Sequence, residues 1–193
     1  GAGGKTSTMY DLAEELAAKG ARILITTSTH IAKPEQYRTE VIPKLADLDA
    51  ASYAGALRNP RGFILAAGKQ AEGPDHAWKL AMPEDLGEER VMKRLLSQFD
   101  VILIEADGAK RLPLKVPSET EPVLIPQTGL IIACVGLTAG GKQFGDSCFR
   151  FASHGSWLHK EAQDAIAAED MTLLQMDERG SRKGVDGRYY RSL

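Results

Sequence analysis

The first residues of the chain combine glycine, lysine and hydroxyl side chains at a spacing that suits phosphate binding. GAGGKTST follows the pattern G-x-x-G-K-T, which is shorter than the common G-x-x-x-x-G-K-[ST]. Glycines let backbone N–H groups converge on an anion, and the positive end of a following helix points to the same place. We predict that this loop binds the phosphates of a nucleoside triphosphate through Gly1, Gly3, Gly4, Lys5, Thr6 and Ser7.

Two residues of this loop have distinct predicted roles. The ammonium of Lys5 would reach the terminal phosphates, and the hydroxyl of Thr6 would bind Mg²⁺. A strand is expected upstream of Gly1, because such loops connect a strand to a helix. A rival pattern occurs at Gly136 to Lys142 in GLTAGGKQ, but Gln143 stands where Ser or Thr should bind the metal. We interpret that segment as a turn near the site.

Two acidic residues follow an apolar run in VILIEADGAK. Glu105 comes directly after that run, at the position of the acid that is linked to Mg²⁺ in P-loop enzymes. Asp107 is two residues further on, and alternation along a strand places both carboxylates on one side. We predict that Thr6, Glu105 and Asp107 hold the metal, and that Lys5, Glu105 and Asp107 are catalytic. The alternative is a strand that ends in a polar turn.

A run of hydroxyl residues, TTSTH, follows another apolar segment. We predict that Thr27, Thr29 and His30 contribute to nucleotide binding, although the pattern leaves open which face of the run is turned inward. Lys110, with Arg111 and Lys115, lies in a proline-rich segment and could close over an anionic ligand. A solvated basic patch is the alternative for these three residues.

The surrounding pattern indicates an α/β protein. Met9 to Ala17 show helical spacing, and apolar runs near residues 21–27, 61–69, 100–105 and 129–137 predict strands. Further helices are expected over 33–57 and 85–99. Continuous apolar strands separated by helices favour a three-layer, P-loop NTPase-like domain with a mostly parallel sheet. We expect residues 1–145 to form this domain and residues 146–193 a mostly helical or irregular extension of it.

Composition narrows the setting of the protein. The formal net charge of −2 provides no field that would attract nucleic acid, and no apolar run reaches the roughly 20 residues of a membrane span. Cys134 and Cys148 show no C-x-x-C spacing, which is typical of reduced thiols in a cytoplasmic protein. We therefore expect neither a nucleic-acid nor a membrane partner.

Three segments together resemble one known family. GAGGKTSTMY, TTSTH and EADGAKRLPLKVPSETEPVLIP are similar to the YqeC family, which is associated with selenium cofactor biosynthesis and selenium-dependent molybdenum hydroxylases. The resemblance extends from Gly1 to about Gly145. Besides the residues above, it places family motif positions on Gly108, Lys115, Pro117, Glu121 and Pro122. Family members normally have residues before the loop and continue past this C-terminus, so the preference for ATP or GTP stays open.

The leading hypothesis is a Mg²⁺-dependent P-loop nucleoside triphosphatase in the maturation of a selenium-dependent molybdenum hydroxylase. The partners that the resemblance implies are the hydroxylase itself or its cofactor-maturation proteins. One alternative is a small-molecule kinase or a ligase, since the short loop also resembles that of Mur-type amide ligases. Another is a nucleotide-gated chaperone or binding partner with little turnover.

Overall fold

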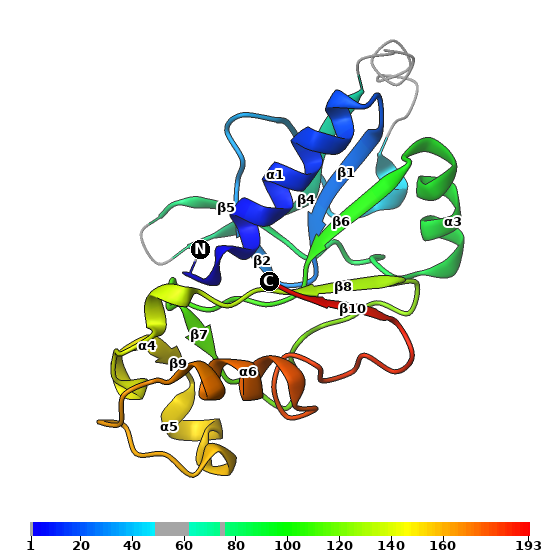
Figure 1. Ribbon diagram of the computed structural model, residues 1–193. Coiled ribbons are helices and arrows are strands. Elements are labelled where there is room, and N and C mark those ends of the chain that lie inside the picture. Colours follow the sequence, from blue (N-terminus) through cyan, green and yellow to red (C-terminus); the bar gives the residue numbers. More distant parts are fainter. Residues whose placement is uncertain (1, 49–61, 74–75) are drawn as a thin grey trace. The chain divides into compact units, whose positions relative to one another are not determined.

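The computed structural model describes residues 2–48, 62–73 and 76–193, and these divide into two compact units (Figure 1). Unit 2 contains residues 8–106 and 125–127, whereas unit 1 contains residues 1–7, 107–124 and 128–193. Each unit is described by itself. The boundary that the sequence suggests near residue 145 stays a prediction.

Unit 2 is built on a sheet with both parallel and antiparallel strands. Its order is β2–β5–β4–β1–β6, and β3 also pairs with β4. The strands are β1 (Arg22–Thr27), β2 (His30–Ala32), β3 (Arg38–Val41), β4 (Phe63–Glu72), β5 (Trp78–Ala81) and β6 (Val101–Glu105). β1, β3, β4 and β6 run parallel, while β5 is antiparallel to both β4 and β2. The carboxyl ends of β1 and β6 therefore meet at one edge of the sheet.

Helices pack on both faces of this sheet. Helix α1 (Lys5–Ala18) places Met9, Ala13 and Ala17 against Ile23 and Ile25 of β1 in one apolar cluster. Helix α3 (Glu89–Gln98) packs in a second cluster, which holds Leu24 and Leu65. Alternation along β1 sends odd residues toward α1 and even residues toward α3, so both faces are apolar. The predicted α/β class is confirmed, and the helical spacing of residues 9–17 does form a helix.

One expectation for the sheet is met only in part, and two others need correction. The main sheet is mixed, because the hairpin of β4 and β5 folds back antiparallel. Residues 33–48 are not mostly helical: they contain β3 and one 3₁₀ turn at Leu45–Asp47, and residues 49–57 lie outside the described part. The run near 129–137 forms β8 (Leu130–Ala133), which pairs with β10 (Tyr189–Ser192) in a separate two-stranded sheet. A strand's apolar character predicts that it pairs but not with which partner.

Unit 1 contains short elements around one small core. They are β7 (Leu114–Lys115), β8, β9 (Cys148–Phe149), β10, α4 (Phe144–Ser147), α5 (Phe151–His154) and α6 (Ala168–Met176), with 3₁₀ turns at Leu137–Ala139 and Ser156–Leu158. Phe144 and Phe151 stack with ring centroids 4.7 Å apart at the centre of this core. β7 and β9 pair in parallel, and this pairing brings two distant loops together.

The sequence analysis also made expectations about membrane spans and about the two cysteines. Among the described residues, no helix is long and apolar enough to cross a membrane. Neither Cys134 nor Cys148 forms a disulfide, and burial raises the pKa of Cys148 to about 12.

Candidate functional site

The glycine loop leads directly into the longest described helix. Gly3 and Gly4 both have φ of 76°, and α1 begins at the next residue, Lys5. The first N–H groups of an α-helix have no acceptor within the helix, so this end of α1 presents donors and a partial positive charge. Gly1 lies outside the described residues, whereas Thr6 is half-buried and Ser7 is exposed on the first turn.

Gly3 is required by both its conformation and its neighbours. A φ of 76° is strained for residues with a side chain. A Cβ there would lie 3.1 Å from the carbonyl oxygen of Cys134 and 3.3 Å from that of Pro113. The N–H of Gly136 donates to the Pro113 carbonyl at 2.8 Å, so these segments are tied to each other as well. The loop is thus held closely against backbone, which leaves room only for glycine.

The side chain of Lys5 reaches one of the two predicted acids. Its Nζ lies 3.3 Å from Oδ1 of Asp107, and each of the two side chains is 20% exposed. The other carboxylate oxygen, Oδ2, is 3.3 Å from Nζ of Lys115, whose side chain is 5% exposed. Asp107 therefore lies between two ammonium groups, one from the loop and one from a buried strand.

Lys115 is the centre of a longer chain of charges in unit 1. Its Nζ is 2.5 Å from Oε2 of Glu121, which also pairs with the guanidinium of Arg150. Burial is the largest single effect on Glu121 and acts to raise its pKa. The hydrogen bonds and charges of Lys115 and Arg150 outweigh it together, so the pKa of Glu121 is lowered. Sequence reasoning singled out neither Arg150 nor the ring beside it, Phe149, and no spacing signal marks them.

The hydroxyl run and Glu105 belong to unit 2. Thr27 and Glu105 are register partners on β1 and β6, and they continue the side of the sheet that packs on α1. Burial and then the carboxylate charge of Glu105 raise the pKa of Tyr10, a residue of α1. Within the hydroxyl run, Thr27 therefore faces α1, whereas Thr26 faces the side of α3.

The structure shows the hydrogen bonds or the exposure of several residues that the sequence analysis singled out. The Thr27 hydroxyl donates to the carbonyl of Glu105 at 2.9 Å, and it accepts a bond from the N–H of Thr29 at the same distance. His30 begins β2 and is exposed. In the rival glycine segment, Lys142 is exposed and is followed by a helix of only four residues.

A metal site made of protein side chains alone is absent from the described residues, where no three His, Cys, Asp or Glu side chains gather closely enough. Mg²⁺ in phosphate-binding sites needs fewer, since one or two protein oxygens act together with phosphates and water. Asp107 Oδ1 fits this role, because it is buried and makes no well-angled hydrogen bond. Thr6 supplies a hydroxyl one residue beyond Lys5. The residues present therefore fit a nucleotide-bound magnesium ion.

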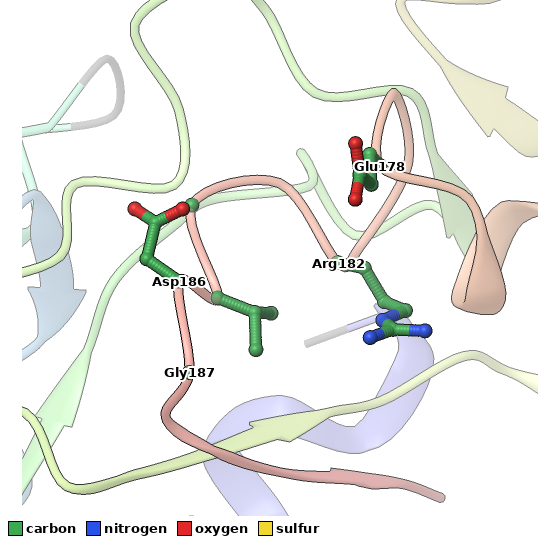
Figure 2. A pocket seen from close by; sticks show the side chains of 6 residues that line it. Glu178, Arg182, Asp186 and Gly187 are labelled. Atoms are coloured by element: carbon green, nitrogen blue, oxygen red, sulfur yellow. The ribbon is translucent and has the colours of Figure 1, made fainter.

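A separate cavity of about 340 Å³ lies in the C-terminal loop of unit 1. Figure 2 shows Glu178, Arg182 and Asp186 around it, and Gly184, Val185 and Gly187 complete its lining. Arg182 Nε is buried there without a hydrogen-bond partner among the described residues. None of the residues predicted to bind nucleotide lines this cavity.

Fold and site together define an α/β protein with a glycine-rich loop that opens a helix and a carboxylate paired to the loop's lysine. The YqeC protein family model matches residues 1–152, and the chain belongs to the YqeC family. It is 33% identical over 187 residues to the "Uncharacterized protein YqeC" of Escherichia coli (strain K12), covering 96% of this chain and 69% of that protein. No solved structure matches the chain.

Proposed function

We propose that the chain is a Mg²⁺-dependent, P-loop type nucleotide-binding protein that hydrolyses a nucleoside triphosphate. One observation carries the proposal: two glycines with φ of 76° deliver Lys5 to the start of α1, where its ammonium lies 3.3 Å from Asp107. The contact with Asp107 holds the Lys5 ammonium near the glycine loop. A phosphate-binding loop needs both the charge and the open N–H groups.

Each residue has a part that follows from its chemistry. Backbone N–H groups of Gly3, Gly4 and Lys5 bind the β- and γ-phosphates, and the ammonium of Lys5 binds the γ-phosphate. Thr6 and Asp107 would hold a magnesium ion, which would supply positive charge against the negative charge that develops during phosphoryl transfer. Glu105, two residues before Asp107, stays the predicted second acid that binds the metal or orients water. Ser7, Thr27, Thr29 and His30 remain candidate nucleotide contacts, and Lys110 remains a candidate contact of an anionic ligand.

The wider part of the proposal concerns fold and pathway. Helices on both sides of a central sheet, together with the loop before α1, support a three-layer P-loop arrangement, in which the antiparallel hairpin of β4 and β5 is an addition. We also propose a role in the maturation of a selenium-dependent molybdenum hydroxylase, with that enzyme or its maturation proteins as partners. This part rests on the association that the sequence resemblance implies, whereas the family match itself carries no function.

Equilibrium binding of fluorescent ATP and GTP analogues with Mg²⁺ tests the proposal. Lys5→Ala should weaken binding at least tenfold, because a charge-assisted contact is worth roughly 1.5–3 kcal/mol. Lys142→Ala is the matched control, since it removes an exposed lysine beside the rival glycine segment of the same unit. Equal affinity in wild type and Lys5→Ala would reject the phosphate loop, and a loss confined to Lys142→Ala would move it to the rival segment.

Phosphate release then separates hydrolysis from binding alone. Asp107→Asn keeps the size of the side chain but removes the charge that binds metal, so release should fall more than nucleotide affinity does. The second candidate activity is transfer of the γ-phosphoryl group to an acceptor. The basic side chains around Phe149 favour it, since an anionic acceptor needs such a place.

A further inference from the structure

Three basic side chains of unit 1 surround one aromatic ring. The Phe149 ring centroid lies 5.2 Å from Nζ of Lys110, 6.0 Å from Nζ of Lys115 and 4.8 Å from the guanidinium carbon of Arg150. β7 and β9 cause this arrangement, because Lys115 and Phe149 are register partners whose side chains share one side of the pair. The residues come from segments that are more than 30 positions apart, so only the folded chain brings them together.

The backbone holds several of these basic residues in an uncommon conformation. Lys110, Arg111 and Arg150 have φ of 44°, 64° and 62°. Few residues other than glycine adopt positive φ, and such residues gather at binding and catalytic sites, where the surrounding structure holds the strain. His76, His159 and Asp186 also have positive φ, so this conformation supports a site only together with the cations around Phe149.

The charges of the cluster do not cancel. Asp107 contacts Lys5 and Lys115, while Glu121 contacts Lys115 and Arg150. When Lys110 is included, there are two carboxylates and four cationic side chains. In the contacts that the structure describes, Lys110 has only the Phe149 ring as a partner. The four cations exceed the two carboxylates by two positive charges. These charges are next to a buried ion network, where water screens charge less than at an open surface.

We propose that Lys110, Lys115 and Arg150 around Phe149 form a subsite for an oxyanion, and that this group belongs to a second substrate. Phosphate and carboxylate are the chemical classes that fit, since Arg and Lys donate charge-assisted hydrogen bonds to both. The inference rests on the proposed function only in treating the anion as a second substrate. Lys110 and Arg150 contact the anion, whereas Lys115 positions Asp107 and Glu121 beside it.

Isothermal titration of the purified protein with inorganic phosphate tests the subsite without nucleotide. Lys110→Ala should raise the Kd for phosphate about tenfold, and Lys110→Glu should raise it further. Lys110 is exposed and has no ion pair among the described contacts, so both variants should fold like wild type, as circular dichroism can check. Lys142→Ala is the control of equal charge and should bind phosphate like wild type.

The same titration in Lys5→Ala separates this subsite from the glycine loop. Phosphate affinity should change less than threefold there, even if nucleotide binding is lost. Absence of phosphate binding in wild type, equal Kd in the Lys110 variants, or loss of binding in Lys5→Ala would each overturn the subsite. These outcomes do not depend on nucleotide, so the subsite stands even if the nucleotide proposal fails.

A second arm repeats the titration with the Mg²⁺ complex of a non-hydrolysable ATP analogue at saturation. The Kd for inorganic phosphate should stay within a factor of three. The phosphates of the nucleotide occupy the glycine loop and leave the cluster around Phe149 open. Competition between the two ligands would show that the cluster binds a phosphate of the nucleotide, and the assignment to a second substrate would be wrong.

Discussion

The two units of the chain are stabilised by different kinds of interaction. Unit 2 has apolar clusters on both faces of a sheet, and its ion pairs, such as Lys93 with Glu89, lie on the surface. Unit 1 has one small apolar core and an ion network that is centred on the buried Lys115. Paired strands therefore support unit 2, whereas charge contacts hold the loops of unit 1 in place. The residues with the most evident chemistry, Lys5 and Asp107, lie in the second kind of structure.

This difference suits the proposed function. Apolar packing tolerates changes of detail and provides a rigid support, while a network of charges fixes the position and ionisation of individual side chains. A buried charge network is weak evidence for stability in itself, because desolvation offsets much of its attraction. We infer that the main role of the network of unit 1 is to position its side chains.

The largest effect is expected in the core of unit 2. Leu65→Ala should lower the free energy of unfolding by about 3 kcal/mol, because Leu65 is fully buried between strands and α3. Leu96→Ala is the control in the same unit, since that side chain is 52% exposed, and it should change stability by less than about 0.5 kcal/mol. Urea unfolding measures both, and equal effects would contradict the packing described for unit 2.

Removal of the central charge of unit 1 should have the next largest effect. Lys115→Met should cost about 2 kcal/mol. This is less than the roughly 3–5 kcal/mol of a buried charge that loses its partner, because Arg150 still pairs with Glu121. The double variant Lys115→Met/Glu121→Gln should recover part of this loss in a double-mutant cycle monitored by urea unfolding. If the two single effects simply add, the network does not act as a unit.

The pH dependence of the free energy of unfolding should show the contribution of the ionised Glu121 side chain. Its pKa is lowered in the folded state, so it contributes stability above its ordinary value of 4.5 and loses that contribution as the pH falls through the folded pKa. Glu121→Gln should be less stable than wild type at pH 7, and the two unfolding free energies should converge toward pH 3. Parallel curves over this range would show that Glu121 has no such role.

The smallest effect is expected for a surface ion pair of unit 2. Lys93→Ala removes the contact with Glu89 on α3, where the two side chains are 75% and 73% exposed. Such a pair contributes roughly 0.3 kcal/mol, which salt reduces further. An effect as large as that of Lys115→Met would remove the contrast between the two units.

Some features of the site were predictable because they are local in the chain. Glycines followed by a lysine and a helical apolar pattern predicted a loop that opens α1, and this is what Gly3, Gly4 and Lys5 form. The apolar run before Glu105 likewise predicted that a strand ends there. The sequence left open which face of the hydroxyl run is turned inward, and only the register of Thr27 with Glu105 identifies it.

Other features depend on contacts between distant segments and left no local signal. The pairing of β7 with β9 brings Phe149 and Arg150 to Lys115 and Glu121. Similarly, β8 pairs with β10 rather than with the main sheet, although its apolar run looked like any other strand. An apolar strand gains stability from any edge that fits, so the choice among edges is made by the rest of the fold.

By itself, the sequence determined the membership in the YqeC family, the loop at the start of α1 and the polar ends of two strands. Those features need only neighbouring residues, whose conformational preferences act over a few positions. Tertiary structure alone decided the mixed sheet, the ionic contacts of Lys115 and the cations around Phe149. Each of these joins segments far apart in the chain, and their charges interact strongly only after folding has removed the water between them.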